Sequence, residues 1–155
     1  MAKVLVVYAS REGATGEIAR EIMHELRDRG LEVDFRTAND VSSLDGYGAV
    51  VLGSSIHLRH WDMDAMRFLQ RHASDLAERQ TWLFQSGPYA RHGESQHAGP
   101  PPAVVERAAE IGAQRPRVFT GNLSGQLRNC DEVKAWTDKI ADQLLSDRVV
   151  YSAQH

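Results

Sequence analysis

Short apolar runs, each about the length of a strand, alternate along this chain with longer stretches in which apolar residues recur at helical spacing. The first run, Lys3–Tyr8, is apolar without interruption from Val4 to Val7. Continuous apolar runs of this kind are typical of parallel strands that helices cover on both faces. The pattern predicts five strands, at Lys3–Tyr8, Leu31–Phe35, Gly48–Gly53, Thr81–Phe84 and Arg117–Thr120.

The stretches between the strands carry apolar residues three or four positions apart, as one face of a helix does. Ile18, Ile22 and Leu26 mark a first helix, which Gly30 can end. Three further helices are expected: one from a cap at Asp62 or Asp64 to Leu76, one between Pro102 and Gly112, and one from a cap at Asp131 through Leu144. Residues 39–47 and the polar stretch 87–102 are expected to be loops, the second long enough to be functional. We expect one domain over residues 1–147 and a tail over 148–155.

Five strands separated by helices in a chain of 155 residues predict an α/β fold of three layers, with helices on both faces of a parallel sheet. The common five-stranded solution has the order 2-1-3-4-5. Its ligand lies at the carboxyl ends of the strands, where the order reverses between strands 1 and 3. Function is therefore expected in residues 9–15, 54–61 and 85–89.

The loop after the first strand has the composition of an anion-binding turn. Hydroxyls at Ser10 and Thr15 bracket Gly13, and the following helix directs free N–H groups and its positive end toward the loop. The loop lacks the GxGxxG pattern of dinucleotide folds and the lysine of a P-loop, so neither NAD nor ATP is expected. A phosphate monoester fits better. Spacing alone leaves open a second interpretation, a helix capped by Ser10 with no ligand.

A receiver domain has the same strand order and can be tested directly on the sequence. It needs acidic residues after strands 1 and 3 and a lysine after strand 5. This chain has Ala9-Ser10, Ser54-Ser55 and Thr120-Gly121 at those places. A phosphoryl-accepting aspartate with its metal pocket is therefore excluded.

The composition of the chain narrows the classes of cofactor and partner that it can have. A lone cysteine, Cys130, excludes a disulfide framework within the chain and a site built from several thiolates. The formal net charge of −3 does not suggest nucleic acid as a partner. No run approaches the roughly 18 apolar residues of a membrane span, and the N-terminal apolar run is too short for a signal peptide. We therefore expect a cytoplasmic protein whose redox role, if it has one, depends on an organic cofactor.

Two motifs resemble the flavodoxins, and in particular the branch of the menaquinone-linked protoporphyrinogen IX dehydrogenases. One is Val6–Thr15, which resembles the flavodoxin phosphate loop, and the other is Val50–His57, continuing through His60 to a helix at Phe68–Ala73. The resemblance covers residues 3–86 well and 116–145 loosely. It implies a flavodoxin-like, FMN-binding domain.

The resemblance also implies the positions of the FMN. Its phosphate would lie on the loop Ser10, Arg11, Glu12, Gly13, Ala14 and Thr15. Its ring would lie between the loop after strand 3 and the loop after strand 4. Backbone groups at Ser55–His57 would meet the redox-active ring nitrogen, and those of Ser86 and Gly87 the pyrimidine edge. The predicted cofactor residues after the first loop are Ser54, Ser55, Ile56, His57, Trp61, Ser86, Gly87 and Tyr89.

A flat ring needs apolar or aromatic walls, and Ile56, His57, Trp61 and Tyr89 can supply them. Trp61 has an alternative interpretation as a residue at a helix start that packs on the core, and Tyr89 as a loop aromatic without a ligand. His57 and His60 could bind a metal, but no third ligand is visible, and no metal is expected.

Two functions follow from the resemblance. The first is a flavodoxin-type electron carrier that exchanges electrons with a redox partner protein or a small molecule. Typical carriers are strongly acidic, whereas this chain has 15 arginines and a net charge of only −3. The alternative is a quinone-linked protoporphyrinogen IX dehydrogenase that acts on a porphyrinogen in haem biosynthesis. Those enzymes carry a long insertion after strand 5, where this chain has only Gly121–Leu127 before the region of the last helix.

Overall fold

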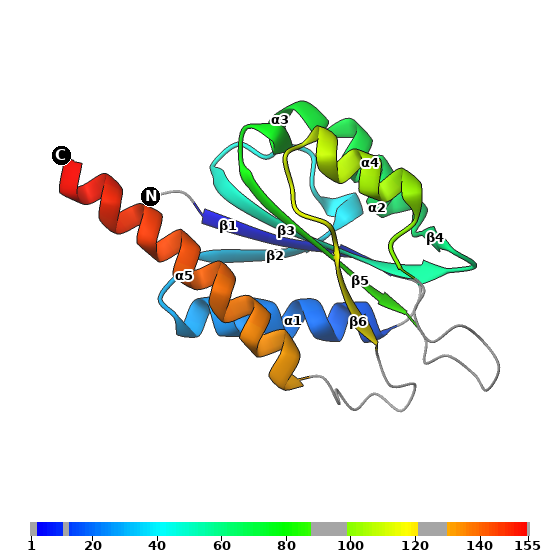
Figure 1. The fold of residues 1–155 in the computed structure, drawn as a ribbon, viewed down its shortest axis with the longest axis horizontal. Helices are drawn as coiled ribbons and strands as arrows, with labels where there is room; N and C mark the ends of the chain where they lie inside the picture. The colour runs from blue at the N-terminus through cyan, green and yellow to red at the C-terminus, as the bar shows by residue number, and fades with distance from the viewer. Residues whose placement is uncertain (1–2, 11–12, 88–98, 121–129, 155) are drawn as a thin grey trace.

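The structure is a computed structural model that describes residues 3–10, 13–87, 99–120 and 130–154 (Figure 1). Five parallel strands form its centre in the order β2-β1-β3-β5-β6. They are β1 (Lys3–Ala9), β2 (Val33–Thr37), β3 (Tyr47–His57), β5 (Gln80–Gly87) and β6 (Arg117–Thr120). Counted without the short β4 (His60–Trp61), this is the predicted order 2-1-3-4-5, and the prediction is confirmed.

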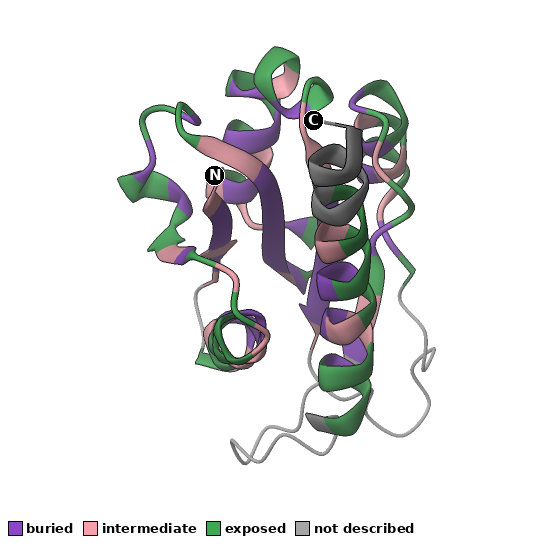
Figure 2. Ribbon diagram, turned by 90° about the vertical axis from the view of Figure 1, so that its left-hand side faces the viewer, coloured by how far each residue is buried: buried purple, intermediate pink, exposed green. Residues whose placement is uncertain are grey.

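The helices form two outer layers, as the three-layer prediction requires. Figure 1 shows α1 (Gly13–Asp28) and α5 (Cys130–Gln154) on one face of the sheet. The other face carries α2 (Met63–Arg71), α3 (Ala73–Ala77) and α4 (Pro102–Glu110). In Figure 2 the strands are largely buried between these layers, and the outward sides of α1 and α5 are exposed.

Alternate residues of the central strands supply the two halves of the core. Leu5, Val7 and Leu52 pack with α2, α3 and α4, whereas Val4 and Val6 pack with α1 and α5. Because successive side chains of a strand point to opposite faces, a continuously apolar strand such as β1 serves both halves. The apolar runs in the sequence therefore record burial on both sides of the sheet.

The structure differs from the sequence prediction in several elements. β5 runs three residues beyond Phe84, so that Ser86 and Gly87, expected in the loop after the fourth strand, are its last residues. β2 covers Val33–Thr37 instead of Leu31–Phe35. The third strand runs four residues beyond Gly53, to His57. The single helix expected as far as Leu76 is divided at His72, whose N–H ends α2 by donating to the Phe68 carbonyl. Asp131 lies inside the first turn of α5 and is not its cap. The same helix continues through residues 148–154, which the sequence pattern had set apart as a tail.

The division at His72 places an ionisable ring in the interior. His72 is only 5% exposed and its ring lies 4.7 Å from that of Phe68. Burial lowers the pKa of His72 below its ordinary value because the interior disfavours the charged imidazolium. The residue therefore favours its neutral form at neutral pH and acts as a core residue.

A short 3-10 turn, η1 (Ala38–Asp40), is the only regular structure in the described segment 38–46, close to what was expected for 39–47.

Candidate functional site

The carboxyl ends of three neighbouring strands meet at one edge of the sheet. Ala9 at the end of β1 lies opposite Ser54 of β3, and Ser54 lies opposite Gln85 of β5. One position further on, Ser55 lies opposite Ser86. The start of α1 lies at the same edge (Figure 1). The three stretches in which function was expected are therefore adjacent in space.

A close approach between β3 and β5 fixes the strands just below this edge. A Cβ atom on Gly53 would lie 2.0 Å from Cζ of Phe84, whose ring is fully buried. A Cβ atom on Gly87 would likewise lie 2.8 Å from Ile56 Cγ2. Only glycine leaves room for these neighbours, so both positions are set by packing. The backbone at the site consequently has little freedom to shift.

The segment expected to be a loop after the third strand is a β-hairpin. Beyond Ser55 the chain pairs antiparallel with β4, Ile56 opposite Trp61 and His57 opposite His60. The two tip residues, Leu58 and Arg59, have φ angles of 50° and 65°. A two-residue hairpin with a type I′ turn has positive φ at both tip positions and normally uses asparagine and glycine there. Because Leu58 and Arg59 have side chains that disfavour this region, the tip holds backbone strain of the kind found at functional sites.

Buried polar contacts hold this hairpin on the sheet. The indole N–H of Trp61 donates to Gln85 Oε1 at 3.0 Å, and Gln85 is fully buried. The Ser54 hydroxyl donates to the Ser55 carbonyl at 2.8 Å and accepts from the Asp62 N–H at 3.0 Å. Asp62 in turn caps α2 by accepting from the Asp64 N–H at 2.9 Å. These bonds connect β3, β4, β5 and α2 directly beneath the hairpin.

Trp61 is 4% exposed and packs in the core beside α2 and α4. This is the core-packed alternative that the sequence left open. It gives Trp61 a role in positioning the hairpin, and a further role as a wall of the cofactor site stays a prediction. His57 is exposed on the hairpin, Ile56 is 7% exposed, and Ser55 is half-buried.

The beginning of α1 provides the candidate anion site. Ser10 directly follows β1 and is half-buried, Gly13 is exposed, Ala14 is half-buried, and Thr15 is 1% exposed. The first turn of α1 contains no acidic residue. Its N–H groups have no partners within the helix, and the helix dipole places partial positive charge there. These residues fit the phosphate of FMN, which needs hydrogen-bond donors; Glu12, directly before α1, lies outside the described residues.

Of the fourteen predicted cofactor residues, Arg11, Glu12 and Tyr89 lie outside the described residues. The structure brings the others to the same edge of the sheet: Ser10, Gly13, Ala14, Thr15, Ser54, Ser55, Ile56, His57, Trp61, Ser86 and Gly87. Ser86 is 2% exposed and Gly87 is half-buried.

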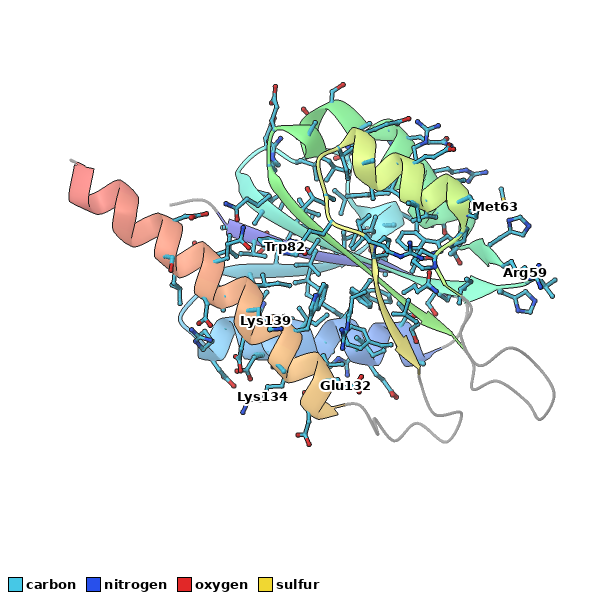
Figure 3. The ribbon with its side chains drawn as sticks, viewed as in Figure 1. Arg59, Met63, Trp82, Glu132, Lys134 and Lys139 are labelled. Carbon is cyan, nitrogen blue, oxygen red and sulfur yellow. The ribbon has the colours of Figure 1, made fainter. Side chains whose placement is uncertain are left out.

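Sequence reasoning missed two apolar residues at the site. Leu58, at the hairpin tip, is 79% exposed, and Met63, at the start of α2, is 63% exposed. They are the large exposed hydrophobic residues of the described part of the chain. Arg59 and Met63 project from the same end of the molecule (Figure 3). In the sequence, Leu58 stands between a histidine and an arginine in a polar stretch. Hydrophobic periodicity does not distinguish an exposed leucine of this kind from a buried one.

The described residues contain neither a metal-binding cluster nor a helix that could cross a membrane. No group of three or more His, Cys, Asp and Glu side chains in that part of the chain is arranged to hold a metal ion. None of its helices has the length and apolar character needed to cross a membrane.

Comparison with known proteins agrees with the fold. A family model described as "Flavodoxin domain" matches residues 5–143. The protoporphyrinogen IX dehydrogenase (quinone) of Escherichia coli strain K12 is 27% identical over 96 residues, which are 61% of this chain and 53% of that protein. This chain thus spans about half the length of the curated relatives it matches.

Two solved structures are similar over nearly their whole lengths. Flavodoxin 2 of Bacillus cereus has a TM-score of 0.69 at 23% identity, covering 92% of this chain and 99% of its own. Flavodoxin 1 of the same organism has a TM-score of 0.71 at 18% identity, covering 91% and 98%. With the family match over residues 5–143, we conclude that this chain belongs to the flavodoxin domain family, which implies FMN as its cofactor.

Proposed function

We propose that FMN binds at the carboxyl edge of the sheet, with its phosphate on residues 10–15. The observation that carries this proposal is the start of α1, whose first turn has no acidic residue, beside the ends of β1, β3 and β5. The ring would lie between the hairpin at 54–61 and the segment that begins at Ser86. Arg11, Glu12 and Tyr89 remain predicted members of this site.

The described residues would contribute mainly through their backbone. The N–H groups of Gly13, Ala14 and Thr15 would hold the phosphate. The Ser54 and Trp61 bonds fix the hairpin, so that its backbone groups near Ser55 and Ile56 are already in place for the ring edge. Bound FMN supplies reversible transfer of one or two electrons, and the chain supplies its position and surroundings.

We propose that the protein transfers electrons between a donor and an acceptor, one of which is a redox partner protein or a small molecule. The exposed Leu58 and Met63 beside the proposed ring site support this proposal. An apolar side chain that is exposed on the hairpin is available for contact with another molecule. A partner that contacts the hairpin would come close to the ring without any rearrangement of the core.

The phosphate position can be tested without disturbing the fold at Gly13. A Cβ atom there meets no other atom within 4 Å, and the residue is exposed. Gly13→Asp adds a carboxylate at a helix start, where it favours the helix but repels a phosphate. We expect Gly13→Asp to weaken FMN binding at least tenfold relative to Gly13→Asn, measured by flavin fluorescence titration of FMN-free protein.

Thermal unfolding of the FMN-free proteins provides the control. Gly13→Asp should unfold at a temperature equal to or above that of Gly13→Asn. Equal FMN affinities for the two variants would show that the phosphate does not lie at the start of α1.

The alternative function is quinone-linked oxidation of protoporphyrinogen IX, which the 27% identity to the E. coli enzyme favours. The test is anaerobic incubation of FMN-loaded protein with protoporphyrinogen IX and menadione, with porphyrin fluorescence as the readout. Gly13→Asp protein without FMN corrects for spontaneous oxidation. Porphyrin formation that depends on bound FMN would establish the dehydrogenase, and its absence would leave the electron carrier.

A further inference from the structure

A groove lies between the outer edge of the sheet and helix α5, away from the proposed FMN site. Its volume is about 580 Å³, within the range of small-ligand sites. Trp82 of β5 and Trp136 of α5 contribute aromatic surface, Arg115 and Arg117 lie on one side, and Lys139 of α5 lies on the other. In Figure 3, Lys139 lies on the part of α5 beside Trp82, whereas Lys134 of the same helix points away from the sheet.

The groove exists because β6 begins late. Arg117 pairs with Phe84, so the first residues of β5, Gln80–Leu83, have no strand beside them on this side within the described chain. Pro116, which has no N–H group, directly precedes β6 and lines the groove.

The sheet and α5 contact each other on either side of the groove. Gln80 Nε2 donates to the carboxylate of Asp147, and Arg117 lies 3.9 Å from the carboxylate of Glu132. Fifteen residues of helix separate these two contacts, or roughly 22 Å along its axis. These two contacts limit the length of the groove along α5. A small molecule fits between them, whereas an extended peptide would have to run past them.

The charge of the groove is one-sided. Three of its lining residues are cationic, and none of its described lining residues is acidic. Among the described residues, no carboxylate forms an ion pair with Arg115 or Lys139, and the Arg117–Glu132 pair is long and exposed. The cations therefore keep their capacity to bind an anion, and arginine in particular suits phosphate and carboxylate groups.

Trp136 gives the groove a fixed aromatic surface. Its ring makes edge contacts with Phe84 at 6.0 Å and Phe119 at 5.6 Å between ring centres. The residue is nevertheless only half-buried, and it lines the groove together with Arg115, Arg117 and Lys139. The side-chain amides of Gln114 and Gln143 also line it and offer both donors and acceptors.

We propose that this groove is a second binding site, for a nucleoside phosphate. The phosphates would contact Arg115, Arg117 and Lys139, the base would lie against Trp136, and the two glutamine amides would bond the edge of the base. Base–aromatic contact and phosphate–cation contact are the two interactions by which proteins commonly hold this class of ligand. The site is independent of the proposed function, since it shares no residue with the FMN site.

The test uses the full chain loaded with FMN and titrated with ATP, without added divalent cation, in a calorimeter. We expect one ATP per chain, with no release of FMN. Arg115→Gln and Lys139→Gln should each weaken ATP binding about tenfold, as the loss of one charge-assisted contact does. Lys134→Gln is the matched control, because it removes the same charge from the same helix outside the groove. Its affinity for ATP should equal that of the wild type.

Two further titrations decide the nature of the ligand. Inorganic tripolyphosphate should bind more weakly than ATP, and Trp136→Phe should weaken ATP without affecting tripolyphosphate. Equal binding of ATP and tripolyphosphate would overturn the nucleoside assignment. Absence of ATP binding, or equal losses in Lys134→Gln and Lys139→Gln, would overturn the site. If a hexaglutamate peptide binds and ATP does not, the nucleoside phosphate proposal is also overturned, and the groove would instead bind an acidic protein partner.

Discussion

At the carboxyl edge of the sheet, buried groups fix the backbone, whereas in the groove beside β6 exposed side chains supply the chemistry. The edge has a glycine against a phenylalanine ring and a buried indole–amide bond. The groove has two arginines and a lysine on its rims, and all three are exposed. A site made from backbone groups must be supported by the core, while a site made from long charged side chains need not be. Substitutions of the buried residues beneath the edge should therefore affect stability and binding together, whereas substitutions of the groove cations should affect binding alone.

The largest effect is expected from Gly53→Ala. The new methyl group would lie about where the Phe84 ring now is, and Phe84 has no room to move because it also packs against Phe119 and Trp136. We expect a loss of about 3 kcal/mol in the free energy of unfolding, at the upper end for an overpacked core. Urea unfolding of FMN-free protein measures it. Gly13→Ala, whose methyl group meets no atom within 4 Å, is the control and should change stability by less than about 1 kcal/mol.

A smaller loss is expected when the indole–amide bond is broken. Gln85→Leu leaves the buried N–H of Trp61 without this acceptor, which costs about 2 kcal/mol. Trp61→Phe removes the donor. If the bond itself holds the hairpin, the double variant should be more stable than the sum of the two single effects predicts. Strictly additive losses in urea unfolding would show that the bond between Trp61 and Gln85 contributes little to stability and does not hold the hairpin on the sheet.

The hairpin tip should respond in the opposite direction. Leu58→Asn with Arg59→Gly supplies residues that accept positive φ, so the strain at the tip is removed. We expect a gain of about 1 kcal/mol in stability. Leu58→Ala with Arg59→Ala keeps the strain and should give no gain. If the Asn-Gly variant is more stable yet exchanges electrons more slowly with an acceptor such as menadione, the tip sequence is kept for contact with that acceptor.

Much of the fold could be predicted because periodicity reports burial. Strands such as β1 are apolar on both faces, and this pattern, together with the helices that separate the strands along the chain, predicted a parallel sheet under two helical layers. The predicted strand order was the common solution for five parallel strands, and the structure has it. The hairpin could not be predicted in the same way, since Leu58 and Arg59 are not turn residues and their positive φ angles are imposed by the surrounding structure. Likewise the break at His72 lies within a continuous apolar face, so periodicity gives no sign of it.

The candidate site was predictable to the extent that it follows the ends of strands. Ser54, Ser55 and Ser86 come together because parallel strands end at one edge, which topology dictates. The burial of Trp61 was not predictable, because an aromatic residue after a strand can face a ligand or the core equally well. What decides it is Gln85, 24 residues further along the chain, which accepts its N–H in the interior.

The smallest effect on stability is expected from a substitution in the groove. Lys139→Gln removes an exposed ammonium group that forms no ion pair with the described carboxylates, so unfolding should change by less than about 0.5 kcal/mol. The loss in the free energy of unfolding caused by Gly53→Ala should then be at least five times that caused by Lys139→Gln, although each substitution changes one residue at or directly beneath a proposed binding site. A loss of 1 kcal/mol or more in Lys139→Gln would mean that Lys139 holds α5 against the sheet. The groove would then be part of the supported structure, and its cations would no longer be free to serve a ligand alone.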